Sequence, residues 1–163
     1  LAPTDSGKMR VLKQLVEMHK DEPTLIIGAY IDQLEEIGEA IGAPVIEGKT
    51  STKKRQELFD KFRAGEITTL VVSKVANFSI DLPEASVAIQ VSGTFGSRQE
   101  EAQRLGRLLR PKADGGTATF YTIVTRDTLD ANYAAHRQRF LAEQGYAYRL
   151  IDADDVHLLE EKN

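Results

Sequence analysis

The sequence predicts an α/β fold in which a mostly parallel sheet carries helices on both faces. Two observations predict it over the 163 residues. Segments with apolar residues at helical spacing alternate with short β-branched runs, and the connections between them are short. This alternation is typical of right-handed βαβ crossovers, which place strands parallel. Ligands of such sheets bind at the carboxyl ends of the strands, so the loops that follow Ile27, Ile46, Val72 and Val91 are the first places to look for function.

The expected helices follow from apolar spacing and from end signals. Val11, Leu12 and Leu15 mark the first helix; Ser51 is a plausible cap, Gly65 ends the third helix, and Pro111 follows the fourth. The expected helices cover 8–20, 30–41, 51–65, 98–110 and 127–144. The expected strands are short apolar runs bounded by turn residues. They cover 25–27, 44–46, 67–72, 87–91, 117–124 and 146–151.

Composition excludes several classes of protein. Hydrophobic residues make up 41% and charged residues 28%, which is ordinary for a globular domain. The absence of Cys excludes disulfides and thiolate metal sites. No apolar run is long enough to span a membrane, and no signal peptide opens the chain, so no membrane partner is expected. The histidines lie too far apart to suggest a metal motif, and core or surface roles are expected for them: His19, His136 and His157.

Basic residues gather in two stretches although the net charge is −4. Between Lys49 and Lys74 there are seven basic residues and three acids, and between Arg98 and Lys112 there are five and two. Acids gather in 32–39 and in 152–163, the latter expected to be an acidic tail. The basic stretches suit a phosphate-bearing partner, and a solvated charged face is the other interpretation.

Two motifs resemble nucleotide-binding sites but lack residues that such sites require. Gly48-Lys49-Thr50 resembles the end of a phosphate-binding P-loop, but the position that requires glycine is Ala43. Asp152 resembles a Walker B acid, but without a P-loop it has no nucleotide to serve. The chain therefore shows no complete active site of its own, and we expect it to be inactive alone as an ATPase.

The stretch from Gln103 to Arg110 carries the informative chemistry. On a helix, Arg107 and Arg110 fall on the side of Gln103, and the leucines of the stretch cluster on the opposite side. Two guanidinium groups on one face suit a polyphosphate, and an arginine finger stabilises the charge on a transferring phosphoryl group. The other interpretation is a solvated arginine face paired with Glu100 or Glu101.

Gln103 to Arg110 matches the Q-x-x-G-R-x-x-R pattern of motif VI in superfamily 2 helicases. The segments 25–30 and 72–83 resemble motifs IV and V in the same order. The closer resemblance is to the xeroderma pigmentosum group B (XPB) DNA helicases, and it spans about 8–151. It rests on SKV at 73–75, DLPEA at 81–85, GSR at 96–98, EAQRLGR at 101–107, RQRFL at 137–141 and QGY at 144–146.

Two positions depart from the patterns of the family. Ala76-Asn77 stands where eukaryotic members are expected to have Gly-Asp, which puts the backbone geometry of the motif V loop in doubt. Ser79 stands where many superfamily 2 proteins have Gly, although this agrees with the XPB branch. The first departure favours a prokaryotic, cytoplasmic protein, with a nuclear location expected if the source is eukaryotic.

The resemblance implies the second RecA-like lobe of a two-lobed DNA motor, with 1–163 as that single lobe. The absent N-terminal lobe would be the first partner and would hold ATP with Mg²⁺. Arg107 and Arg110 would be catalytic toward the phosphates, with the nucleotide also contacted by Gln103, Asp81 and Ser79. Single-stranded or forked DNA would be contacted by Tyr30, Gly48, Thr50, Ser73 and Lys74. For Tyr30, a packed aromatic is the equal alternative.

The resemblance also implies a role in DNA repair, with repair nucleases or transcription and repair proteins as further partners. Two other functions compete with the motor. One is a non-catalytic RecA-like lobe kept as an interaction platform, which has no need of Arg107 and Arg110 together with Gln103. The other is a doubly wound domain that binds a small molecule, which would normally carry its own glycine-rich phosphate loop.

Overall fold

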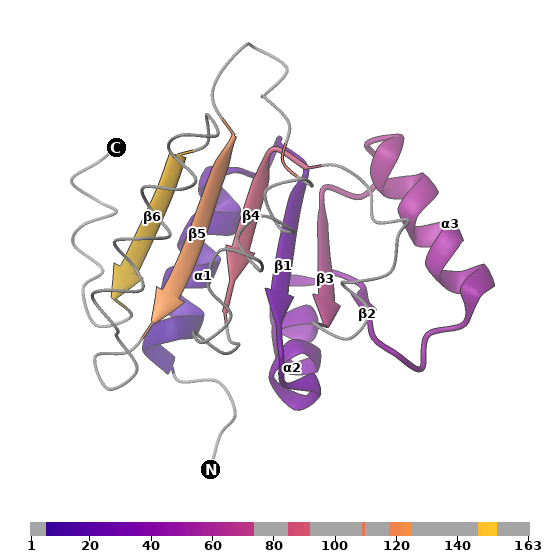
Figure 1. Cartoon of the computed structure of the whole chain (residues 1–163), viewed down its shortest axis with the longest axis horizontal. Helices are drawn as coiled ribbons and strands as arrows, with labels where there is room; N and C mark the ends of the chain where they lie inside the picture. Colours follow the sequence, from indigo (N-terminus) through magenta and orange to yellow (C-terminus); the bar gives the residue numbers. More distant parts are fainter. Residues whose placement is uncertain (1–5, 74–84, 92–108, 110–117, 125–146, 153–163) are drawn as a thin grey trace.

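The computed structural model describes residues 6–73, 85–91, 109, 118–124 and 147–152. Helices and strands alternate as the sequence predicts (Figure 1). The helices are α1 (Ser6–Met18), α2 (Ile31–Ile41) and α3 (Thr52–Arg63). The strands are β1 (Thr24–Gly28), β2 (Val45–Ile46), β3 (Thr69–Ser73), β4 (Val87–Gln90), β5 (Thr119–Val124) and β6 (Ala147–Asp152). Each predicted element within the described ranges is present, with its ends within two residues of the predicted positions.

The six strands form one sheet in the order β2-β3-β1-β4-β5-β6. Every pairing between these strands is parallel, which confirms the prediction from the βαβ alternation. β1 lies in the middle, paired with β3 on one side and β4 on the other. The first half of the chain thus builds one side of the sheet, and the second half extends it through β5 and β6.

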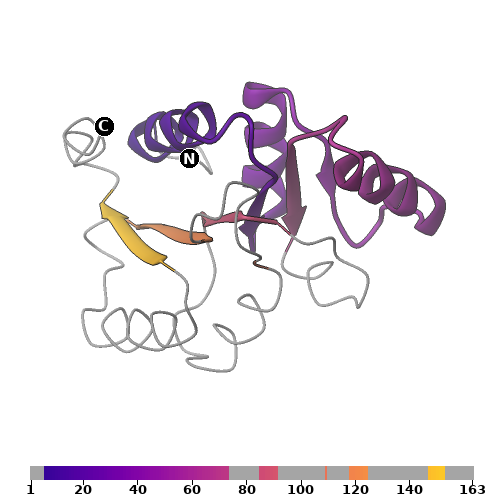
Figure 2. The same ribbon diagram turned by 90° about the horizontal axis from the view of Figure 1, so that it is seen from above.

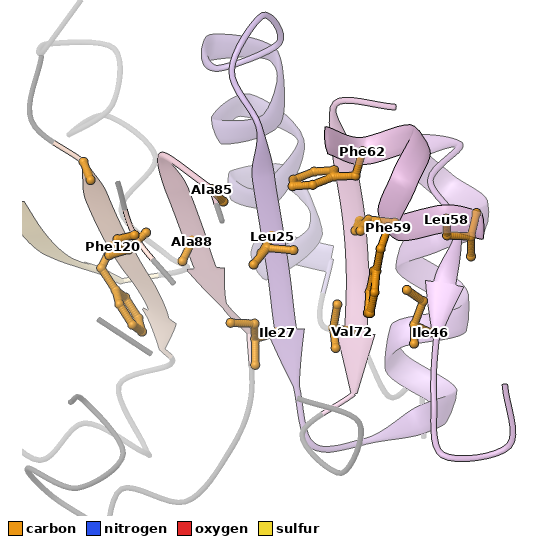
Figure 3. Close-up of a cluster of buried hydrophobic side chains, with 13 residues drawn as sticks. Leu25, Ile27, Ile46, Leu58, Phe59, Phe62, Val72, Ala85, Ala88 and Phe120 are labelled. Atoms are coloured by element: carbon orange, nitrogen blue, oxygen red, sulfur yellow. The ribbon is translucent and has the colours of Figure 1, made fainter. Parts of the chain in front are cut away.

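Two hydrophobic clusters cover opposite faces of the sheet because successive strand residues alternate between them. Along β1, Leu25 and Ile27 belong to one cluster and Ile26 to the other. α1 and α2 pack on the Ile26 face, and they lie together on one side of the sheet in Figure 2. α3 packs on the Leu25 face, beside the β2 end of the sheet (Figure 3). Helices therefore cover both faces, as predicted.

The helix ends show why the connections are short. Ser51 caps α3: its hydroxyl oxygen accepts from the Lys54 N–H at 3.1 Å, which confirms the predicted cap. Gly42 ends α2 with φ at 72°, a conformation that glycine adopts without strain. The chain can therefore turn directly from α2 into β2. None of the helices among the described residues is long and apolar enough to cross a membrane.

The predicted helix at 98–110 is wrong at its end. Leu109 forms a parallel β-bridge with Ala85, and its side chain is 1% exposed in the cluster of Leu25 and Ile27. The bridge explains the difference, because Ala85 is far from Leu109 in sequence and a local helical pattern does not contain this partner. The buried leucine face is confirmed at this one position. The rest of that stretch and the predicted helix at 127–144 lie outside the described residues.

Candidate functional site

The strand register brings three predicted binding loops to one edge of the sheet. Gly28, the last residue of β1, pairs with Ser73, the last residue of β3. Ile46, the last residue of β2, pairs with Val72 one position earlier. The segments that leave β1 and β2 therefore start beside the end of β3. Tyr30, Gly48 and Thr50 lie on these segments, at the carboxyl edge where parallel sheets bind ligands.

Tyr30 lies on the surface of this edge. It is 63% exposed and occupies the N-cap position of α2, where its carbonyl accepts from the Leu34 N–H at 3.0 Å. Its extended backbone holds the residue at the start of the helix, and its side chain makes no capping hydrogen bond. Of the two interpretations of Tyr30, a packed aromatic is wrong. An exposed ring is free to stack on a base or contact a sugar.

The segment after β2 forms a closed turn. The Glu47 N–H donates to Thr50 Oγ1 at 2.9 Å, and the Thr50 N–H donates to the Glu47 carbonyl at 3.0 Å. This reciprocal pair fixes the turn and leaves Gly48 and Lys49 exposed at its tip. The tip can accept a phosphate close to the backbone because Gly48 has no side chain there. The Thr50 hydroxyl serves the turn and is half-buried.

Sequence reasoning missed Arg55 as a candidate. It lies in the first turn of α3, directly after this loop, and its N–H donates to the Ser51 carbonyl at 2.9 Å. The side chain is half-buried, and its Nε is buried without a hydrogen-bond partner. It shares the inward side of α3 with Leu58 and Phe59. The signal in the sequence was a cation at helical spacing from apolar residues. Burying an unpaired donor costs free energy, and a bound anion would remove this cost, so Arg55 is a candidate for phosphate binding.

The remaining predicted site residues divide into two groups. Ser73 lies at the end of β3 with its side chain 1% exposed, so a direct contact with DNA would require its neighbours to uncover it and stays a prediction. The others lie outside the described residues: Lys74, Ser79, Asp81, Gln103, Arg107 and Arg110. Their roles stay predictions.

Acidic side chains neighbour the Glu47 turn. A hydrogen bond to the Glu47 carboxylate raises the pKa of Glu35, and repulsion from Glu47 and Asp32 adds to this rise. Lys49 opposes it. Glu35 lies on the second turn of α2 and is exposed, so solvent screens the pair. The hydrogen bond between Glu35 and Glu47 nevertheless joins α2 to the turn that holds Gly48.

Replacing Glu35 by glutamine should raise the thermal midpoint at neutral pH. A raised folded-state pKa means that the pair stabilises the fold at pH values below the usual Glu pKa, and that this contribution is lost as pH rises through the folded value. Glutamine keeps a donor for Glu47 and removes the repulsion. The advantage of Glu35→Gln over the parent should therefore shrink on acidification from about pH 7 to about pH 4, measured by thermal unfolding. Glu36→Gln, the adjacent exposed position, is the control, and an equal pH profile for both variants would contradict the interaction.

The fold defines the class of this chain. The C-terminal domain of the DEAD-box protein Dbp5 matches it with a TM-score of 0.68 at 18% identity, covering 97% of this chain and 92% of that domain. The Escherichia coli DEAD-box protein SrmB matches with a TM-score of 0.64 at 18% identity, covering 92% of this chain and 86% of that one. At this identity the likeness shows the fold alone. The chain has the RecA-like fold that these neighbours share.

Sequence comparison shows the family. The model of the ERCC3/RAD25/XPB C-terminal helicase matches residues 1–162, and the chain belongs to this family. The DNA 3'-5' helicase XPB of Mycobacterium tuberculosis is 71% identical over 156 residues, and that of Kineococcus radiotolerans is 70% identical over the same length. Each alignment covers 96% of this chain but only 28% of the relative. The resemblance to the XPB helicases is confirmed, and the chain spans under a third of these relatives.

Proposed function

We propose that this chain is the second motor lobe of an ATP-dependent DNA helicase or translocase of the XPB type. Membership of the XPB C-terminal family carries the proposal, because the match extends over nearly the whole chain. The gathering of the β1, β2 and β3 exits at one edge supports it. In a two-lobed motor this lobe supplies arginines to the ATP phosphates and holds the DNA backbone, and closure of the lobes moves the strand.

ATP and Mg²⁺ belong mainly to the other lobe in this proposal. The Gly48–Thr50 loop lacks the P-loop glycine, and its turn is closed by the Glu47 and Thr50 hydrogen bonds. Across the described ranges, no three His, Asp or Glu side chains gather in a way that could hold a metal ion. The nucleotide contacts of this lobe would come from Arg107 and Arg110, aided by Gln103, Asp81 and Ser79. When bound, Mg²⁺ would neutralise charge on the phosphates.

The isolated chain should show no ATP turnover above a buffer blank, with or without single-stranded DNA. A chain that also carries an ATP-binding lobe should hydrolyse ATP, and DNA should stimulate it. Release of phosphate from both proteins measures this difference. Turnover by the isolated chain would contradict the division of labour between lobes. A two-lobed protein that binds ATP but is indifferent to DNA would favour an interaction platform.

DNA binding by the chain should be weak, independent of sequence and sensitive to salt, because its contacts would be phosphates while the net charge is −4. Arg55→Ala should weaken binding of a labelled single strand by about 10-fold at low salt, since it removes a guanidinium from the first turn of α3, directly after the Gly48 loop. Arg63→Ala removes the same charge from the last turn of α3, where Arg63 pairs with Asp60 at 3.2 Å. Equal losses for both variants would indicate general electrostatic attraction rather than a site at the carboxyl edge.

The name of one relative supports the proposed partners. The Drosophila melanogaster protein that is 40% identical over 152 residues is named a helicase/translocase subunit of general transcription and DNA repair factor IIH. For this chain we propose single-stranded or forked DNA, the N-terminal lobe of the same protein and DNA-repair proteins as partners. The 70% and 71% identities to bacterial XPB proteins favour a cytoplasmic role in a prokaryote.

A further inference from the structure

The charged side chains of two neighbouring helices are separated by sign. α2 carries four acids and no basic residue, and all four side chains are exposed: Asp32, Glu35, Glu36 and Glu39. α3 carries five basic residues and two acids. These helices pack on opposite faces of the sheet, so the acidic and the basic surface lie on different sides of the domain. A polyanion is therefore attracted to the α3 side and repelled from the α2 side.

Two of the five basic residues of α3 are turned toward the domain or paired with an acid. Arg55 lies on the inward side of the helix and is half-buried. Arg63 pairs with Asp60 at 3.2 Å, and its guanidinium carbon lies 6.0 Å from the centre of the Phe59 ring. The other three basic residues are lysines with exposed side chains, and we call them the lysine surface: Lys53, Lys54 and Lys61.

The charges of the lysine surface are available to a ligand. Lys54 Nζ lies 3.9 Å from Glu57 Oε2, and both side chains are exposed, so water screens this pair and it contributes little to stability. Among the described residues, neither Lys53 nor Lys61 forms an ion pair. Lys54 and Lys61 are seven residues apart, which places them on one side of the helix and about 10 Å apart along its axis. Two cations in this arrangement can contact two phosphates of one backbone.

The chemistry of the lysine surface differs from that of the carboxyl edge. Proteins that hold single strands combine cations with aromatic rings on which the bases stack. Tyr30 supplies an exposed ring at the carboxyl edge. The aromatic residues of α3, which the structure describes over its whole length, are Phe59 and Phe62, and they are 1% and 3% exposed. The lysine surface thus offers charge without stacking, which suits a double helix because its bases are stacked inside and its phosphates lie outside.

We propose that the lysine surface of α3 is a docking surface for the phosphate backbone of duplex DNA. The inference rests on the proposed motor function, because a helicase or translocase that holds one strand at the carboxyl edge also meets the adjoining duplex. α3 lies at the β2 end of the sheet, and its first turn follows the Gly48 loop (Figure 1). The lysine surface therefore begins next to the expected single-strand contacts and continues away from them along the outside of α3. The acids of α2 disfavour the opposite orientation of the domain on DNA.

The test compares two double variants of the two-lobed protein, each of which loses two exposed lysines. Lys54→Gln with Lys61→Gln removes charge from the lysine surface. Lys13→Gln with Lys20→Gln is the matched control in and after α1, because Lys20 pairs with an acid three residues away, as Lys54 does. Binding of a labelled blunt-ended duplex, and of a labelled single strand of the same length, is measured at several salt concentrations without ATP.

The lysine-surface variant should bind the duplex about 10-fold more weakly than the parent at low salt. The slope of log affinity against log salt should become shallower by about two, because each lost phosphate contact removes about one released counterion. Affinity for the single strand should change by less than about threefold, since its contacts lie at the carboxyl edge. The control variant should keep the slope of the parent with both probes. Lys54→Arg with Lys61→Arg keeps both charges and should keep the slope as well.

Equal changes in duplex binding for the two glutamine variants would overturn the proposal, because attraction would then follow net charge alone. Equal losses for duplex and single strand would also overturn it, since the lysine surface would then belong to the single-strand site. Unchanged binding of both probes would mean that the surface serves another partner, such as RNA or an acidic protein. Lys61→Glu, with the same expected direction, replaces the double variant if thermal unfolding shows that the latter folds poorly. A parent protein that binds neither probe would refute the proposed motor function together with this surface.

Discussion

Replacing Arg107 or Arg110 by alanine in the two-lobed protein should lower DNA-stimulated ATP turnover by about 10³-fold or more. The transferring phosphoryl group spreads negative charge over its oxygens, and a guanidinium stabilises that charge more in the transition state than in the ground state. Lysine at either position should restore only part of the rate, because an ammonium lacks the planar fork of donors. Steady-state phosphate release with saturating DNA measures the loss.

Stability separates this catalytic role from a structural one. The alanine variants should keep nearly the thermal midpoint of the parent, as expected for side chains that serve a partner outside the fold. Leu109→Ala makes the contrast. Leu109 is 1% exposed in the hydrophobic cluster, and truncating it should cost about 2–5 kcal/mol of folding free energy. If Arg110→Ala instead unfolds the protein, Arg110 has a structural role. If the variant keeps near-normal ATP turnover, Arg110 is not catalytic.

Phe59→Ala should destabilise the chain by about 3–5 kcal/mol, among the largest effects expected of a single substitution here. The ring is 1% exposed between α3 and the β2 end of the sheet, in one cluster with Ile46 and Val72 (Figure 3). Its loss removes apolar burial and leaves a cavity that the strands cannot close by moving. Chemical denaturation monitored by circular dichroism measures the change in the free energy of unfolding.

Phe59→Ala should also weaken DNA binding under conditions in which the variant stays folded. Loss of the ring loosens the packing of α3, which carries Arg55 and follows the Gly48 loop. Lys53→Ala, at an exposed position of the same helix, should change stability by no more than about 0.5 kcal/mol. A comparable cost for both substitutions would mean that the packing of α3 on the sheet contributes little. A Phe59→Ala variant with the same free energy of unfolding as the parent would contradict the arrangement of the core at this edge.

Much of the fold could be predicted because the patterns are local. Apolar runs such as 25–27 are bounded by turn residues, which predicts a strand. The Ser51 hydroxyl can cap a helix, which predicts a helix start. Each of these elements is therefore predicted from residues close to it in sequence. The prediction that failed within the described residues was the end of the 98–110 helix. Helical spacing continues through Leu109 in sequence, but Leu109 pairs with Ala85, a partner that the local pattern does not contain.

The candidate site was predicted unevenly for a related reason. Tyr30 and Gly48 follow predicted strands, and the rule for parallel sheets places both at the carboxyl edge. Arg55 was missed because its sequence context, among other basic residues of a helix, resembles a solvated face. Only packing of α3 shows that its Nε is buried without a partner. The exposure of Tyr30 likewise separates two interpretations that the sequence left equal.

The sequence by itself determined the α/β alternation, the parallel sheet, the XPB resemblance and the residues expected to meet phosphate. These features depend on the periodicity and the chemistry of residues that lie close together in the sequence. Only the tertiary structure decided which distant groups meet. It placed Lys8 on the Val91 carbonyl, Gly28 beside Ser73 and Leu109 against Ala85. The physical reason is that such contacts depend on the register and packing of whole elements, which a local pattern leaves undetermined.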